Sequence, residues 1–169
     1  YEAVTDYVRH GYNQALVAKQ RHIGFLMILM QRLVTSSTAA IRTTLERRQT
    51  LLNEPEPQAS LFDSTEMDEW AEMDGQSQVD IAVQTSGWAQ EKAEVDLLLN
   101  LARETEAQGT DAKAEALLEL IYKLQQEEND PTMKVLIFTE FVPTQGMLAG
   151  FLESRGFSVA LLNGSMDLD

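Results

Sequence analysis

The stretch Lys134-Val-Leu-Ile-Phe-Thr139 decides the fold that we expect for this chain of 169 residues. It is a short apolar run rich in β-branched and aromatic residues, which is typical of a strand buried on both faces. A helical pattern follows, opened by Pro143-Thr144 and closed by Arg155-Gly156, and Phe157–Leu162 reads as a second buried strand. Strand, helix and strand in this order predict a parallel βαβ unit with a right-handed crossover.

Helical spacing of apolar residues dominates the sequence before this unit. It predicts helices over residues 1–34, 39–52, 88–108 and 111–128, with Gly109 ending the third of them. Gly11 and Gly24 are expected to break or kink the first helix, and residues 35–38 are a cluster of capping residues. The fold class expected from the sequence is therefore α/β, dominated by long helices.

The net charge of −14 is distributed unevenly along the chain. Residues 1–50 carry seven basic and three acidic residues, whereas residues 51–111 carry two basic and fifteen acidic ones. Charge blocks of this kind usually mark solvated segments, so we expect residues 53–86 to be an acidic, partly disordered insertion. Within it, Val79–Val83 alternates weakly, as a short strand might.

Several classes of site and location are not supported by the sequence. The chain has no cysteine, which excludes disulfides and thiolate zinc sites, and it has no P-loop or dinucleotide-binding fingerprint. We expect no catalytic and no metal-binding residue. The longest apolar run, Ile23–Met30, is too short to span a bilayer, and no secretory signal is present. These features predict a cytoplasmic protein without a membrane partner.

The carboxyl ends of the two expected strands are the place for a ligand in an open parallel sheet. These ends are Thr139-Glu140-Phe141 and Asn163-Gly164-Ser165. Gly164 allows close approach of a backbone to an anion and Ser165 adds a hydroxyl donor, although Asn-Gly-Ser is also a common tight turn. Beside a phosphate, the Glu140 carboxylate must pair with a cation, cap an amide or face away, and the sequence alone names no partner.

The same residues carry a resemblance to a known family. Lys134–Phe141, followed by Thr144, Leu148 and Leu152 and by Leu162–Ser165, resembles the opening of the second RecA-like lobe of helicase superfamily two. More narrowly, it is similar to the Swi/Snf-type DNA-dependent ATPases, above all to large bacterial helicase-like proteins. Gln31–Ser37, continuing to Leu45 and Arg47, resembles the helical segment between the two lobes of those proteins.

This resemblance implies an organisation and a function. Residues 1–52 would end the first motor lobe, residues 53–86 would be the insertion, residues 87–109 a helix, and residues 110–169 the first part of the second lobe. The implied nucleic-acid-binding residues are Thr139, Glu140, Phe141, Gly164 and Ser165, together with Lys113 near the lobe surface. The parent protein would bind DNA, ATP and magnesium, whereas this part would bind no cofactor and hydrolyse no ATP alone.

A second hypothesis is a non-enzymatic acidic helical module that docks a basic protein, or whose acidic part pairs with its own basic first helices. Arg42, Arg47 and Arg48 are either phosphate contacts or an ordinary solvated helix face. Because the chain starts inside a helical pattern and stops after a strand and turn, we interpret it as a piece of a longer protein. A bare strand edge would then allow a non-physiological oligomer.

Overall fold

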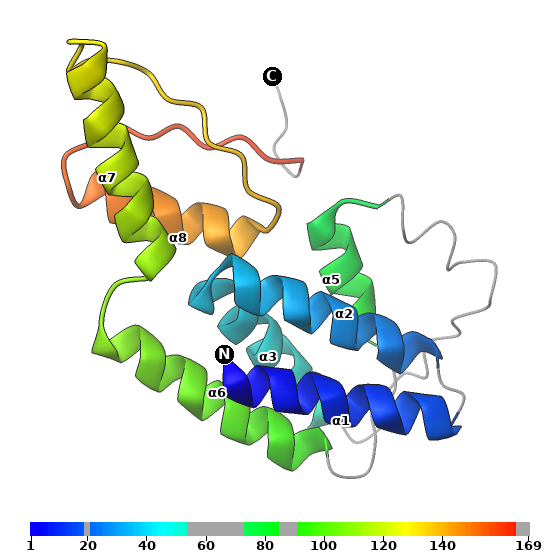
Figure 1. The fold of residues 1–169 in the computed structure, drawn as a ribbon. Coiled ribbons are helices and arrows are strands. Elements are labelled where there is room, and N and C mark those ends of the chain that lie inside the picture. Colours follow the sequence, from blue (N-terminus) through cyan, green and yellow to red (C-terminus); the bar gives the residue numbers. More distant parts are fainter. Residues whose placement is uncertain (19–20, 54–72, 85–90, 165–169) are drawn as a thin grey trace.

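The computed structural model describes residues 1–18, 21–53, 73–84 and 91–164, and all the regular secondary structure in these ranges is helical (Figure 1). The helices expected over residues 39–52, 88–108 and 111–128 are confirmed with small shifts of their ends, whereas the single helix expected over residues 1–34 is two helices that pack against each other. The helices are α1 (Glu2–Ala18), α2 (Arg21–Ser36), α3 (Thr38–Leu52), α5 (Gly75–Val83), α6 (Glu91–Gln108), α7 (Ala112–Glu127) and α8 (Val142–Glu153).

Helices α1, α2, α3, α5 and α6 form a bundle around one apolar core, to which Phe141 also belongs. The most deeply buried stripe belongs to α2, whose Leu26, Met27, Met30 and Leu33 are almost completely inaccessible to solvent. These residues recur at three- and four-residue intervals, which places them on one face of the helix. The periodicity read from the sequence therefore identified the central helix of the bundle.

The expected break at Gly11 and Gly24 is wrong, because both glycines lie inside helices. Gly11 is buried in α1, and a Cβ atom at this position would collide with the sulfur of Met27 on α2. The missing side chain thus allows the two helices to approach closely. A glycine that serves helix packing looks the same in the sequence as one that ends a helix.

Three helices of the described part begin at a side-chain cap. Ser37 accepts a hydrogen bond from the Ala40 amide at the start of α3, and Asp111 does the same for Lys113 and Ala114 at the start of α7. Asp74 caps α5, so Val79–Val83 is helical and the weak strand expected there is wrong. The cap and the burial of Val79, Ala82 and Val83 against the bundle stabilise a helix here, although the short alternating pattern had favoured a strand.

The predicted α/β class and its RecA-like parallel βαβ unit are contradicted by the structure. Residues 134–139, before α8 in the chain, and residues 157–162, after it, are extended segments that form no strand and no sheet. Ile137, Phe157 and Val159 pack, half-buried, on a small cluster made by α7 and α8. This part of the chain is therefore a helix pair with two extended segments laid against it (Figure 1).

The βαβ prediction was wrong because an apolar run does not by itself show whether both of its faces are covered. Residues Val135–Phe138 have the composition of a strand buried on both faces, and such burial requires a layer of structure on each side. Within the described residues, α7 and α8 supply one layer only, and Leu136 and Phe138 face solvent. The sequence thus indicated an extended, apolar segment. Whether such a segment forms a β-ladder depends on a neighbouring strand, which the local sequence does not reveal.

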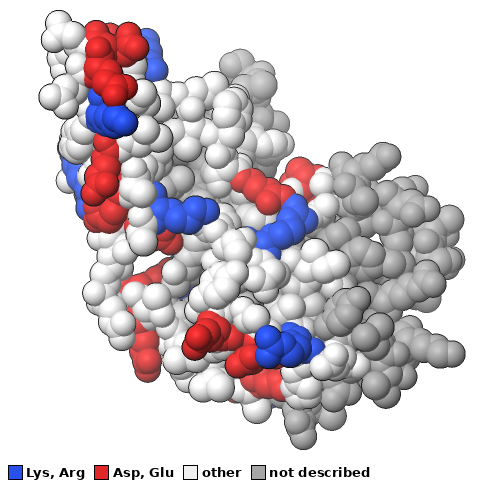
Figure 2. All heavy atoms as spheres, viewed as in Figure 1, with Lys and Arg blue, Asp and Glu red and all other residues white. Residues whose placement is uncertain are grey.

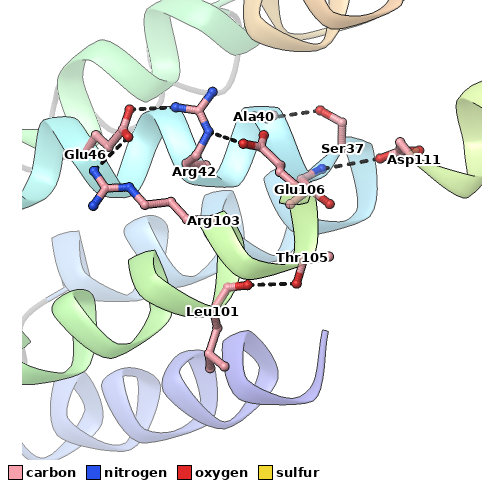
Figure 3. Close-up of polar contacts among 10 residues, drawn as sticks. Ser37, Ala40, Arg42, Glu46, Leu101, Arg103, Thr105, Glu106 and Asp111 are labelled. Carbon is pink, nitrogen blue, oxygen red and sulfur yellow. Dashed lines mark hydrogen bonds and ion pairs between the residues drawn. The ribbon is translucent and has the colours of Figure 1, made fainter. Parts of the chain in front are cut away.

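The three arginines singled out on α3 are all engaged inside the molecule. Figure 3 shows Arg42 bonded to Glu46 and to Glu106 of α6, while Arg103 of α6 reaches back to Glu46. Burial raises the pKa of Glu46, but the hydrogen bonds from Arg103 and Arg42 lower it by more, so this pKa lies below its usual value. Arg47 pairs with Asp80 of α5.

The deepest charged contact joins Arg48 of α3 to Glu91, the first residue of α6. Both side chains are buried, with Nε–Oε1 and Nη2–Oε2 distances of 2.7 and 2.8 Å, and Arg48 also donates to the Val83 carbonyl at 2.6 Å. Tyr7 of α1 donates its hydroxyl proton to the same carboxylate at 3.1 Å. Burial, and then the charge of Glu91, raise the pKa of Tyr7 well above its usual range. The Arg48–Glu91 pair therefore connects α1, α3, α5 and α6.

Among the helices of the described residues, none has both the length and the apolar character that crossing a membrane would require.

We expect Arg48→Ala to destabilise the chain by about 3–5 kcal/mol, because it leaves the Glu91 carboxylate buried without its ion-pair partner. The double variant Arg48→Met/Glu91→Leu should recover most of this loss, since no buried charge remains. Arg9→Ala, which removes an exposed pair with Asp6, should change stability by less than about 1 kcal/mol. Urea unfolding measures all three. Equal losses for Arg48→Ala and Arg9→Ala would contradict the prediction.

Candidate functional site

Four of the six residues predicted to bind nucleic acid lie together at one cleft. We call it the α5 cleft; it has a volume of about 450 Å³ and separates α5 from the start of α8 and the end of the second extended segment. Its α5 side consists of Asp74, Gln76, Ser77 and Asp80. Its other side consists of Thr139, Glu140, Phe141, Val142, Gln145, Leu162, Asn163 and Gly164. Residues 139–141 and 163–164 thus line the same cleft, although the sheet from which their proximity was predicted is not formed.

Phe141 anchors this site to the helical bundle. Its side chain is 1% exposed and belongs to the core formed by the bundle helices, while its backbone begins α8 without a side-chain cap. The guanidinium of Arg32 lies 5.9 Å from the centre of its ring. Because Phe141 is buried, its ring serves to hold the start of α8 on the bundle and presents little surface to a ligand.

Glu140 has the cationic partner that the sequence did not reveal. Arg32 of α2, far away in the chain, forms an ion pair with the Glu140 carboxylate and donates a second hydrogen bond to Gln78 of α5. Gly75 leaves room for this carboxylate, because a Cβ atom there would lie 2.5 Å from the Glu140 Cγ atom. The negative charge at residue 140 is thus neutralised within the molecule.

The hydroxyl group of Thr144 joins α8 to the junction of α2 and α3. Thr144 is buried, and its Oγ1 atom lies 2.8 Å from the hydroxyl oxygens of both Ser36 and Ser37. Ser37 also caps the start of α3, so its side chain joins the start of α3 to Thr144 of α8. We call Arg32, Ser36, Ser37, Glu140, Phe141 and Thr144 the α8 joint.

Gln145 holds the far wall of the α5 cleft. Its amide donates to the Leu162 carbonyl at 2.8 Å, and its carbonyl oxygen accepts from Asn163 at 3.0 Å. The turn at Asn163-Gly164 is therefore tied to the first turn of α8. At Gly164, an added Cβ atom would meet no atom of the described residues within 4 Å, and the residue is exposed.

The inner surface of the α5 cleft favours hydrogen-bond donors over anions. Asp74 and Asp80 line it, and the buried Oε1 atom of Gln76 has no hydrogen-bond partner among the described residues. Hydrogen bonds from the Ser77 hydroxyl, the Ser77 amide and the Gln76 amide lower the pKa of Asp74, which keeps it ionised. A phosphate inside the cleft would therefore meet the two carboxylates of Asp74 and Asp80.

Lys113, another of the six predicted residues, does not line the α5 cleft. Lys113 lines a separate pocket of about 580 Å³ between the α2–α3 junction and the start of α7, and its ammonium group donates to the Thr35 carbonyl at 2.9 Å. Ser165 lies outside the described residues. The sequence could not predict that Lys113 lies apart from the other predicted residues, because the spacing of residues along the chain does not give their positions in space.

Sequence reasoning missed Arg32, Thr144 and Gln145 as members of this site. Arg32 and Thr144 lie within the stretches on which the family resemblance was noted, which is the signal that could have drawn attention to them. Their long-range partners could not be found, because single-sequence periodicity describes faces of one helix and not contacts between distant segments.

No cluster of three or more His, Asp or Glu side chains with metal-binding geometry occurs in the described ranges. His10 instead pairs with Glu94 of α6, at 2.6 Å between Nδ1 and Oε1.

We compared the chain with models of protein families, with curated proteins and with solved structures, and none of them matches it. The Swi/Snf resemblance therefore remains a hypothesis based on the residues quoted above.

We expect Thr144→Val to destabilise the chain by about 1–3 kcal/mol, because it keeps the shape of the side chain but removes the partner of two hydroxyl groups. Thr105→Val is the matched control. Its hydroxyl group is exposed and bonds only within α6, so its effect should stay within about 0.5 kcal/mol. Urea unfolding gives both values. The α8 joint would be unimportant if the two variants were equally stable.

Proposed function

We propose that this chain is part of an ATP-driven DNA translocase of the Swi/Snf type, working in the cytoplasm, in which it contributes DNA-contacting residues and does not itself hydrolyse ATP. One observation supports the proposal most strongly. The two stretches that carry the family resemblance, around Arg32–Ser37 and Glu140–Thr144, contact each other directly through the α8 joint. Stretches that act together in a motor are expected to be in contact, although separated by about a hundred residues.

The proposed DNA contact is the outer edge of the α5 cleft at Gly164. Its backbone is exposed and unobstructed, and Gln145 fixes the turn that presents it. Backbone amides of such turns hold phosphate groups without reading base sequence. Glu140 and Asp80 are paired with Arg32 and Arg47, so the repulsion of a phosphate by these two carboxylates is reduced.

ATP and magnesium are assigned to other parts of the proposed parent protein. Transfer of a phosphoryl group needs a P-loop lysine, magnesium ligands and an arginine that stabilises the developing charge. The printed sequence contains no P-loop motif. The role proposed for this chain is therefore to hold DNA while the motor changes shape.

The alternative, a non-enzymatic module that uses charge to bind a partner, also has an observation in its favour. Basic residues of α3 pair with acidic residues of α5 and α6, namely Arg47 with Asp80 and Arg42 with Glu106. We predicted this pairing for residues 60–75, of which residues 60–72 lie outside the described residues. The surface in Figure 2 shows further acidic side chains along α7, which a basic protein could bind.

We expect Gly164→Glu, made in the full-length product of the gene, to raise the DNA concentration needed to stimulate ATP hydrolysis about tenfold, because a carboxylate there repels phosphate. Gly109→Glu is the matched control, since an added side chain at Gly109 also meets nothing within 4 Å. It should leave the stimulation within about twofold. Residues 1–169 alone should hydrolyse no ATP.

Two results would contradict the proposal. One is a full-length protein whose ATP hydrolysis does not respond to DNA, and the other is an equal effect of both glycine substitutions. A salt-sensitive complex of the chain with a basic protein, without any ATP hydrolysis by the full-length product, would favour the alternative.

A further inference from the structure

Arg32 of α2 joins the two walls of the α5 cleft. Its guanidinium forms the ion pair with Glu140 of one wall, and it donates a hydrogen bond to Gln78 of α5, the helix that makes the other wall. The ring of Phe141 lies 5.9 Å from the same guanidinium. Arg32 is itself not one of the residues that line the cleft. This side chain therefore holds both walls without forming part of the inner surface.

Glu140, in contrast, lines the α5 cleft together with Gly164. Its side chain is 44% exposed and packs against the start of α5, where a Cβ atom added to Gly75 would lie 2.5 Å from the Glu140 Cγ atom. This packing does not depend on Arg32. If Arg32 lost its charge, the Glu140 carboxylate would stay beside the cleft and would have no cationic partner there.

Each carboxylate that lines the α5 cleft has a partner of a different kind or from a different helix. Asp80 pairs with Arg47 of α3, and Asp74 accepts hydrogen bonds from two backbone amides at the start of α5. Glu140 pairs with Arg32, and it is the carboxylate on the wall that also carries Gly164. In a cleft, an unpaired charge is screened less than on an open surface, so it repels a phosphate more strongly.

We propose that Arg32 is a positioning residue for the DNA contact and that it acts only through Glu140. It keeps the Glu140 carboxylate paired, so that a phosphate group can approach Gly164, and it does not contact DNA itself. This inference rests on the proposed function, because it concerns the same DNA contact. It adds a residue of the helical bundle that controls how strongly the outer edge of the cleft binds DNA.

A direct contact between Arg32 and a phosphate group would be a different role, and it has a different consequence. An arginine that binds phosphate itself contributes through its own hydrogen bonds, so its loss has the same effect with or without a charge at residue 140. An arginine that acts through Glu140 matters only while residue 140 is a carboxylate. A double-mutant cycle separates these two roles.

DNA-stimulated ATP hydrolysis by the full-length product of the gene measures this cycle. We expect Arg32→Gln to raise the DNA concentration needed for half-maximal stimulation about fivefold, because an unpaired carboxylate then faces the phosphate. In the Glu140→Gln background, the same substitution should change this concentration by less than about twofold. Arg9→Gln is the matched control, since it removes one positive charge from an exposed pair with Asp6 on α1, and its effect should stay within about twofold.

An effect of Arg32→Gln that is equally large in the Glu140→Gln background overturns the proposal, and so does an Arg32→Gln variant that behaves like Arg9→Gln. Glu140→Gln alone does not depend on the folding of any Arg32 variant. It should lower the DNA concentration needed about twofold, and a rise overturns the proposal.

The wild type separates this inference from the proposed function. If its ATP hydrolysis responds to DNA and Gly164→Glu weakens the response, a failed cycle refutes only the role of Arg32. If the wild type does not respond to DNA, the proposed function and the role of Arg32 are both refuted. Circular dichroism of each variant verifies that it is folded.

Discussion

The burial of Phe141 in the core of the helical bundle is the constraint on which the rest of the site depends. This residue begins α8, and placing its ring beneath Arg32 brings the start of α8 onto the junction of α2 and α3. Thr144 then reaches the Ser36 and Ser37 hydroxyl groups. Since Gln145 is in the same turn, the position of Gly164 follows from it too. An apolar contact thus sets the geometry of a polar cleft.

Electrostatics in this chain mostly serve the inside of the molecule. The Arg48–Glu91 pair holds four helices together, and Arg42 and Arg47 are paired with acidic residues of α6 and α5. A buried pair of this kind contributes little net stability, but it makes other helix arrangements costly, since they would leave a charge without a partner. A strongly acidic chain can therefore fold around a basic helix, and its net charge is a poor guide to its partners.

Helices could be predicted from the sequence because their signal is local. The apolar stripe of α2 and the caps Ser37 and Asp111 depend on residues within a few positions of one another. The extended segments could not be predicted as sheet or coil, because a ladder requires a neighbouring strand. Of the predicted site residues, Thr139, Glu140, Phe141 and Gly164 line the α5 cleft without the sheet from which their proximity was predicted, and Phe141 is buried.

The sequence by itself determined helices α3, α6, α7 and α8 and the capping cluster before α3, but not α5 with its Asp74 cap. Only the tertiary structure decided that Arg32 pairs with Glu140, that Lys113 belongs to another pocket, and that Leu136 and Phe138 are left exposed. The physical reason is the range of the interactions. Hydrogen bonds of helices and caps join residues close in the chain, whereas ion pairs, hydroxyl contacts and apolar cover join segments that only folding brings together.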